Sequence, residues 1–301
     1  MKAPIYLVIN ADDLGRSPSI NSAIEYAHRL GILNSASMMA GGEAFGEAVE
    51  LAKRNPGLSI GLHITLCDGR SVLPHSEIPG LTKKDKNGFF GFFEKSPAKA
   101  GLKYWTQRKT LTGQIEAEIE AQFDRLIAAG ITPAHVDSHH HLHAHPVIFK
   151  ALCGAAMKRG VKCMRMPPGP FGEFLNTALG IHFSKIQKIP EWMVFQALEF
   201  YNEGAARNMG FQFAQTYGLS HTGRICENYL MRLIPSVKGP VAEIFLHPDL
   251  STQEGKREME AVMSEKVKKL AGSCGITLAG FKDVKMASER KLAGKEKEQE
   301  R

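Results

Sequence analysis

Short apolar runs alternate with amphipathic stripes along most of the chain. Residues 4–10 form a continuous apolar run of strand length, which is typical of a strand buried on both faces. Ser17 and Pro18 follow as a helix N-cap residue and a proline at the first helical position, and they predict a helix that ends near Gly31. The same alternation continues toward the C-terminus. It predicts strands over 33–40, 58–66, 134–137, 161–165 and 241–246, and helices over 43–54, about 113–129, about 146–159 and 253–270.

Alternation of strands and helices indicates a mainly parallel sheet, either open or closed into a barrel. Three segments depart from it. Residues 67–112 form a long connection rich in aromatic residues, and residues 168–240 are irregular, with an apolar patch at 192–201. Connections of this length are usually functional or flexible. Residues 287–301 are highly charged without an apolar face, so we expect a disordered tail there.

Composition narrows the class of protein. The chain has 301 residues, 43% of them hydrophobic and 23% charged, which is typical of a globular protein and excludes a disordered chain or a cysteine scaffold. The N-terminal apolar run is too short for a signal peptide, and the five cysteines form no CxxC pair, so we expect a cytoplasmic protein with reduced thiols. The net charge of +7 hints at an anionic partner without naming one.

Polar residues that suit catalysis follow several predicted strands. Asp12 and Asp13 follow the first strand, His63 lies near the end of the third, a cluster from Asp137 to His143 follows the fourth, and His247 follows the late strand. In parallel α/β proteins the functional groups gather at the C-terminal ends of strands. If the sheet closes into a barrel, these residues converge on one rim.

The histidine cluster has two interpretations. Six of the twelve histidines lie between His135 and His145, and such a run can be a solvated loop or an incidental chelating tract. Together with His63 and the aspartate pair, however, it favours a site for one divalent cation, because carboxylate and imidazole ligands suit a hydrolytic metal. A catalytic site typically uses three protein ligands, so the remaining histidines would orient ligands or face substrate.

The other candidate residues also have plainer alternatives. The aspartate pair could cap the following helix, His247 could be a core histidine, and Arg165, at the end of a predicted strand, could be a surface charge. Adjacent residues leaving a strand point in different directions. One carboxylate could therefore bind the metal while its neighbour acts as a base.

At these residues the sequence resembles the YdjC-like family, carbohydrate deacetylases related to chitooligosaccharide deacetylases. Finer motifs resemble its hopanoid-biosynthesis-associated branch, HpnK. The family motifs are Asn10–Gly15, Gly61–His63, His135–His143, Glu243 and His247–Pro248, and the branch motifs are Asp68–Pro74, Glu77–Pro79 and Glu118–Phe123. The consecutive His139, His140 and His141 lie nearer the general family pattern than the branch pattern.

The resemblance implies a deformed (β/α) barrel, here one domain over residues 1–286 with insertions at about 67–112 and 168–240. It implies one divalent metal, magnesium or zinc, held by Asp13, His63 and His139, with Asp12 as the base. Our hypothesis adds His247 as the acid and Arg165 as the residue that fixes Asp12 and keeps it ionised. Four further residues are candidates for substrate contact or for support of the ligands: Asp137, His141, His143 and Glu243.

The resemblance also implies the substrate, an N-acetylated amino sugar, which in the HpnK branch is an N-acetylglucosaminyl group on a hopanoid lipid. The apolar patch at 192–201 and the aromatic 67–112 segment would suit a lipid, a peripheral contact at the inner face of the membrane, a homo-oligomer or simply the core. Alternatives are a chitooligosaccharide (diacetylchitobiose-type) deacetylase, a two-metal hydrolase such as a phosphoesterase, and a non-enzymatic lipid- or nucleic-acid-binding protein. No basic-aromatic motif of a nucleic-acid module is present, so we expect no nucleic-acid partner.

Overall fold

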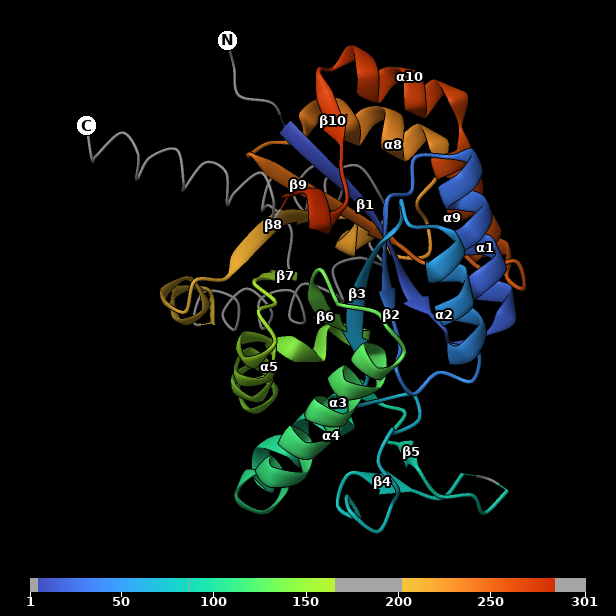
Figure 1. Cartoon of the computed structure of the whole chain (residues 1–301). Coiled ribbons are helices and arrows are strands. Elements are labelled where there is room, and N and C mark those ends of the chain that lie inside the picture. The colour runs from blue at the N-terminus through green and yellow to red at the C-terminus, as the bar shows by residue number, and fades with distance from the viewer. Residues whose placement is uncertain (1–4, 86, 166–201, 285–301) are drawn as a thin grey trace, which may run out of the picture.

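A closed barrel of parallel strands forms the centre of the molecule (Figure 1). The computed structural model describes residues 5–85, 87–165 and 202–284. Because β1 pairs with both β2 and β9, seven described strands form the ring, and this confirms the predicted deformed (β/α) barrel. In ring order the strands are β1 (Ile5–Leu14), β2 (Ser35–Met38), β3 (Ser59–Ile64), β6 (Val136–Ser138), β7 (Cys163–Arg165), β8 (Gln212–Tyr217) and β9 (Val241–Leu246).

A short C-terminal strand adds to the barrel from outside. This strand, β10 (Ile276–Leu278), pairs in parallel with Ile5–Leu7, ahead of the point where β2 begins to pair with β1 at Asn10. The N-terminal half of β1 therefore has β9 and β10 as neighbours, and its C-terminal half has β9 and β2. This arrangement leaves the C-terminal end of β1 inside the ring, where Asp12 and Asp13 lie.

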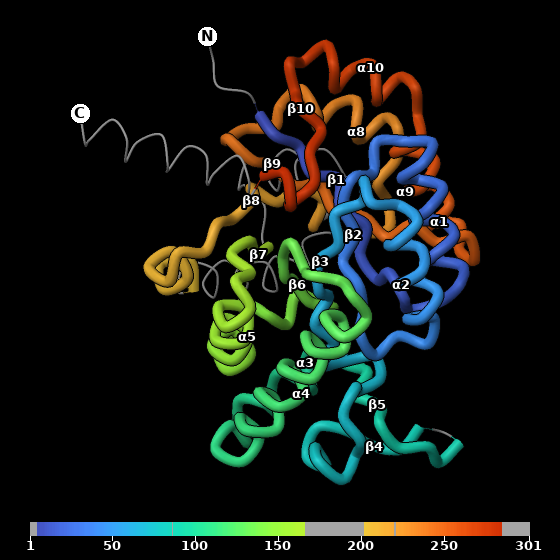
Figure 2. The backbone as a smooth tube through the Cα atoms, viewed as in Figure 1, coloured from blue at the N-terminus to red at the C-terminus, as the bar shows by residue number. Residues whose placement is uncertain are grey.

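Helices cover the outer surface of the barrel (Figure 2). Their positions follow the predicted pattern closely, and Ser17 caps the first helix by accepting a hydrogen bond from the Ile20 N–H at 3.3 Å. The described helices that pack around the strands are α1 (Pro18–Leu30), α2 (Phe45–Arg54), α4 (Arg108–Ala128), α5 (Pro146–Lys158), α8 (Glu227–Leu233), α9 (Gln253–Met263) and α10 (Glu265–Ser273).

One predicted helix is wrong in its extent. The stretch 253–270 is two helices, and the second of them, α10, continues to Ser273. Ser264 lies between them in an extended conformation, and its side chain accepts a hydrogen bond from the Val267 N–H at 3.4 Å. Its hydroxyl also donates to Glu227 on α8 at 2.7 Å. A serine can cap a new helix without interrupting the apolar periodicity, which explains why the pattern concealed the break.

The predicted 67–112 connection contains more regular structure than the pattern indicated. It holds a small antiparallel pair, β4 (Thr82–Lys83) and β5 (Phe92–Phe93), then α3 (Pro97–Thr106) and the first turn of α4. Its aromatic residues divide into two groups. Phe93 and Tyr104 are buried, and the Tyr104 hydroxyl donates to the Leu66 carbonyl at 2.6 Å, whereas Phe89 and Phe90 remain exposed.

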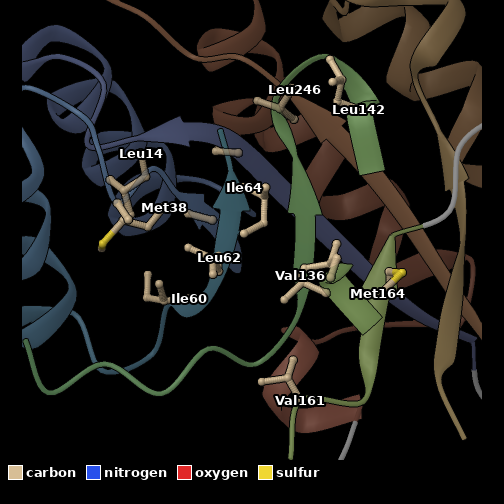
Figure 3. Close-up of a cluster of buried hydrophobic side chains, with 14 of the residues drawn as sticks. Leu14, Met38, Ile60, Leu62, Ile64, Val136, Leu142, Val161, Met164 and Leu246 are labelled. Atoms are coloured by element: carbon tan, nitrogen blue, oxygen red, sulfur yellow. The ribbon is translucent and has the colours of Figure 1, made fainter. Parts of the chain in front are cut away.

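Alternation along the strands separates an apolar outer layer from a polar interior. On β3, Leu62 and Ile64 belong to the main hydrophobic core, drawn in part in Figure 3, while His63 points to the opposite side and contacts Asp137 of β6. Successive strand residues point to opposite faces. Apolar side chains such as Leu62, Val136 and Met164 therefore pack beneath the helices, and the intervening polar residues meet inside the ring.

Some predictions fall outside the described residues. These are the apolar patch at 192–201, the part of the second irregular segment before residue 202, and the charged tail at 287–301. Within the described part of the chain, no helix combines the length and the apolar character needed to cross a bilayer.

Candidate metal centre and catalytic groups

Asp12 and Asp13 owe their different orientations to an irregular end of β1. The pairing of β1 with β2 shifts register between Ala11 and Leu14, and Asp13 has a φ of 68°, in the left-handed region. This conformation is uncommon for a residue with a side chain and is often found at functional sites. The alternative in which the acids cap α1 is wrong, because Ser17 performs that role.

Asp13 lies with two histidines in an arrangement suited to a metal ion. Its Oδ1 is 3.0 Å from Nδ1 of His139 and 3.4 Å from Nε2 of His63, and one donor atom from each residue lies within 4.8 Å of the others. Oδ1 is buried and accepts no hydrogen bond of good geometry from the described residues. Buried carboxylate oxygens rarely remain without a partner. Two imidazoles and one carboxylate form a donor set that fits a catalytic divalent cation.

Asp137 orients His63 within this group. The Nδ1 atom of His63 lies 2.7 Å from Oδ1 of Asp137, so a proton on Nδ1 is held there and Nε2 faces Asp13. A carboxylate on the far nitrogen commonly fixes a metal-binding histidine. Burial alone would lower the pKa of His63, but the Asp137 and Asp12 carboxylates outweigh it and raise that pKa to about 10. A cation bound at this ring would therefore compete with a proton for it.

His139 contacts Arg16 and Asp68, two residues for which the sequence predicted no role in the site. Arg16 Nη1 lies 3.0 Å from Nε2 of His139, and its Nη2 donates to Asp68 Oδ2 at 2.9 Å. Asp68 Oδ2 is itself 3.6 Å from Nε2 of His139. In the sequence, a role for these residues was indicated only by position: Arg16 lies in the turn after Asp13, and Asp68 begins a branch motif. Their meeting depends on the closed barrel.

Arg165 links Asp12 to two further carboxylates. It donates through Nη1 and Nη2 to the two oxygens of Asp12, each at 2.7 Å, and its Nε donates to Glu243 Oε1 at 2.9 Å. Its Nη2 is also 3.0 Å from Oδ2 of Asp137. Arg165 is fully buried, so the surface-charge alternative is wrong. One guanidinium thus contacts three buried carboxylates and fixes the orientation of Asp12.

His247 lies on the solvent side of Asp12. Its Nε2 is 3.8 Å from Oδ2 of Asp12, and its side chain is 33% exposed, so the core-histidine alternative is wrong. Its backbone N–H donates to the buried Glu258 at 2.6 Å, which anchors the segment after β9. Asp12, Asp13, Arg16 and His247 line a common cavity of about 380 Å³. This cavity gives an external molecule access to both carboxylates.

The remaining candidates from the histidine cluster, His141 and His143, lie outside the cavity. His140 and His141 have φ values of 54° and 53°, so the backbone turns sharply and the neighbouring rings diverge. His141 packs edge-on against Phe245, with ring centroids 5.2 Å apart. His143 is fully buried, its Nδ1 lies 2.7 Å from the Ser138 hydroxyl, and burial lowers its pKa to about 4. Neither histidine lines the cavity.

A larger groove adjoins the cavity. Its volume is about 670 Å³, and it shares Arg16, Ile20 and Asp249 with the smaller space. Its walls include Asp68, Gly69 and Arg70 from the first branch motif, together with residues of β4, β5 and their connecting turn. The candidate metal ligands therefore lie beside an extended groove as well as a compact cavity.

Comparison with known proteins identifies the family of the chain. The family model described as YdjC-like protein matches residues 6–272, which include all the residues of the site. The chain belongs to the YdjC-like family. A crystal structure from Enterococcus faecalis, described as a candidate cellobiose-phosphate cleavage protein, has the same fold. Its TM-score is 0.71 at 22% identity, and the match covers 94% of this chain and 99% of that one.

Curated relatives of this YdjC-like protein are carbohydrate deacetylases. The chain is 40% identical over 142 residues to the carbohydrate deacetylase of Brevibacillus brevis, covering 47% of this chain and 52% of the relative. It is 31% identical over 222 residues to the carbohydrate deacetylase of Geobacillus stearothermophilus, covering 74% of this chain and 78% of that relative. The chain thus spans about half the length of the first relative and over two thirds of the second.

Proposed function

We propose that the protein is a metal-dependent hydrolase that removes the acetyl group from an N-acetylated amino sugar. The observation that carries the proposal is the divergent pair at the end of β1. Asp13 faces two histidines, Asp12 faces a buried arginine, and both carboxylates border the same cavity. Amide hydrolysis needs an activated water and a base beside it, and this pair provides a position for each. The names of the curated relatives support the same activity.

In the proposed reaction each residue of the site has a defined task. Asp13, His63 and His139 would hold the divalent cation, which when bound polarises the amide carbonyl and lowers the pKa of water. Asp12 removes a proton from the attacking water, and Arg165 keeps its carboxylate oriented toward the cavity. His247 donates a proton to the departing amine. The products are acetate and the free amino sugar.

A two-metal phosphoesterase is the main rival, and the position of Arg165 argues against it. Two further groups of donor atoms are close enough for an ion. One is Asp68, His139 and His140, in which Arg16 already pairs with Asp68 at 2.9 Å. The other is Asp12, His63 and Asp137. However, Arg165 is bonded to Asp12 and lies 3.0 Å from Asp137, so its positive charge occupies that position. Elemental analysis separates the alternatives: one metal equivalent supports deacetylation, and two equivalents support the phosphoesterase.

For the substrate we propose an N-acetylglucosaminyl group on a hopanoid lipid, as in the HpnK branch. The branch motif Asp68–Pro74 supplies three residues of the groove, and the groove also contains the apolar side chains of Met39 and Phe92. These apolar side chains could contact an apolar aglycone, while the charged residues of the same groove suit the polar sugar. A diacetylchitobiose-type chitooligosaccharide is the alternative, and it would need polar contacts to its second sugar in the same groove.

Acetate release from a panel of N-acetylglucosamine conjugates tests the proposal. The panel contains lipid-linked and chitobiose-type substrates, each assayed with the metal removed by a chelator and then restored. We expect release that stops on chelation, returns with magnesium or zinc, and is fastest for the lipid-linked substrate. Faster turnover of the chitobiose-type substrate would favour the alternative. If none of the substrates releases acetate in a metal-dependent way, the proposed activity is wrong.

A further inference from the structure

The turn between β4 and β5 exposes two adjacent aromatic side chains. Phe89 is 67% exposed and Phe90 is 48% exposed, and Phe89 is the most exposed large hydrophobic residue in the described part of the chain. Figure 1 shows the turn projecting away from the barrel. Isolated exposed apolar residues are common in proteins, whereas an adjacent aromatic pair on a projection suggests a contact surface.

Hydrogen bonds within the turn fix the backbone that carries these two rings. The Asp85 carboxylate accepts from the N–H groups of Asn87 and Phe89 at 2.9 and 2.8 Å, and the Asp85 N–H donates to the Phe89 carbonyl at 2.8 Å. Gly88 adopts a φ of 88°, as the tight turn requires. The His75 ring stacks on Phe90 with centroids 4.2 Å apart. The turn is therefore preorganised with its aromatic pair directed outward.

Cations without carboxylate partners lie beside the aromatic pair. Lys84 Nζ is 4.7 Å from the centre of the Phe90 ring, and Arg70 lies over Phe92 at 5.0 Å. Neither they nor Lys95 forms an ion pair within the described residues, although Lys83 pairs with Glu94. Of the nearby carboxylates, Asp85 holds the turn and Asp68 binds Arg16, while Glu43 lines the same groove. This combination of exposed aromatic rings and unpaired cations is complementary to anionic headgroups above an apolar layer.

The same segment forms one wall of the groove that leads to the candidate metal centre. Lys84, Lys95 and Phe92 line the groove together with Arg16 and Asp68, which contact the metal-site histidine His139. A molecule bound at the turn would therefore lie beside the groove that adjoins the cavity of the site. A free polyanion, in contrast, would need the cations but would have no use for the outward-facing phenylalanines.

We propose that the described residues of the β4–β5 turn, 84, 85 and 87–91, together with Arg70 and Lys95, dock the protein on an anionic lipid membrane. Phe89 and Phe90 enter the interface, the cations contact lipid phosphates, and the groove opens toward the lipid headgroups. This inference rests on the proposed function only for the identity of the molecule that then enters the groove. Membrane docking itself is a property of the surface and can be measured without turnover.

Co-sedimentation with vesicles tests the docking. Vesicles of phosphatidylcholine are compared with vesicles that also contain phosphatidylglycerol, at low and high salt. We expect binding to the anionic vesicles that weakens with salt. Joint substitution of Phe89→Ser and Phe90→Ser should reduce partitioning at least about tenfold, because two rings lose their apolar contact. Lys84→Gln should reduce it about fivefold.

Two matched controls use comparable residues on other elements. Leu30→Ser on α1 removes an apolar side chain that is 58% exposed, and Lys150→Gln on α5 removes an exposed lysine. Both should bind vesicles like the unchanged protein. Acetate release from a water-soluble N-acetylglucosamine conjugate should be the same for the Phe89 and Phe90 variant as for the unchanged protein. Circular dichroism confirms that each variant is folded.

Three results would overturn the docking proposal. They are equal binding to neutral and anionic vesicles, no vesicle binding at all, and undiminished binding by the phenylalanine variant. Undiminished binding by that variant, together with binding to heparin, would identify the surface as a polyanion site. Vesicle binding without acetate release from any substrate would refute the proposed function and leave docking intact. Acetate release without vesicle binding would refute docking and leave the proposed function intact.

Discussion

Asp12 and Asp13 are neighbours in the chain, yet their carboxylates contact different partners. The left-handed φ of Asp13 turns its side chain toward His63 and His139, while Asp12 accepts two hydrogen bonds from Arg165. The two acids thereby acquire distinct electrostatic surroundings. Burial alone would raise the pKa of Asp13, but the adjacent His139 and His63 hold it well below its usual range. Asp13 is therefore ionised and available as a ligand at any physiological pH.

Asp68 offers a prediction at this scale. When His139 binds a cation through Nδ1, its Nε2 carries the proton. Arg16 Nη1, a donor 3.0 Å away, must then move aside, and Asp68 Oδ2 at 3.6 Å is the nearby carboxylate that can accept the proton. Asp68→Asn should therefore weaken metal affinity by about 10- to 100-fold, measured by calorimetric titration. Glu43→Gln, which removes another carboxylate from the same groove, is the matched control and should leave affinity unchanged. Equal affinity of both variants would exclude this role for Asp68.

At the scale of elements, β3 positions the site through a glycine as well as through His63. A Cβ atom on Gly61 would lie 2.2 Å from the ring of His135, which is fully buried against Phe281. No side chain fits there without moving that ring or the strand. The glycine in the Gly61–His63 motif is thus explained by the close approach of the His135 ring to the backbone of β3.

The corresponding prediction concerns Gly61→Ala. The added methyl group should reduce the free energy of unfolding by about 1–3 kcal/mol, as overpacking of a core does. Urea unfolding of the purified variant measures this quantity. Gly154→Ala on α5 is a suitable control, because its added Cβ meets nothing within 4 Å. A stability equal to that of the control would show that the barrel interior can accommodate the methyl group.

His135 gives the barrel interior a dependence on pH. Burial lowers its pKa to about 4, whereas an unfolded chain titrates near the ordinary 6.5. Between these values the unfolded state binds a proton that the folded state rejects, so this residue reduces stability as pH falls from about 6.5 to 4. Its contribution to the change of the free energy of unfolding with pH is at most about 1.4 kcal/mol per pH unit. Other buried groups contribute their own slopes, so the comparison is made with a variant.

The variant is His135→Gln, which keeps a polar group near Ser37. Urea unfolding at several pH values should show a shallower decline below pH 6.5 than in the unchanged protein, whatever the variant costs in overall stability. Parallel curves for the two proteins would mean that His135 takes up a proton while folded. The same comparison above pH 7 serves as an internal control, because this histidine is neutral there in both states.

At the scale of the whole molecule, the sequence patterns predicted the architecture more accurately than they predicted the contacts between side chains. The run 241–246 is strand β9 with the same bounds, because a strand buried on both faces leaves a continuous apolar signal. Strand ends carrying Asp12, His63 and His247 could be recognised for the same reason. The pattern could not show that Arg165 is buried among three carboxylates, or that Arg16 and Asp68 meet at His139. Those contacts join distant parts of the chain and arise only when the barrel closes.

The most direct test of the central claim compares metal binding and acetate release in Asp12→Asn and Asp13→Asn. We propose that Asp12 acts on the water and that Asp13 binds the metal, so the two variants should fail differently. Asp12→Asn should bind one metal equivalent with normal affinity and lose about 10²- to 10⁴-fold in turnover. Asp13→Asn should lose both metal and activity. Retention of full activity by Asp12→Asn, or loss of its metal, would contradict the account.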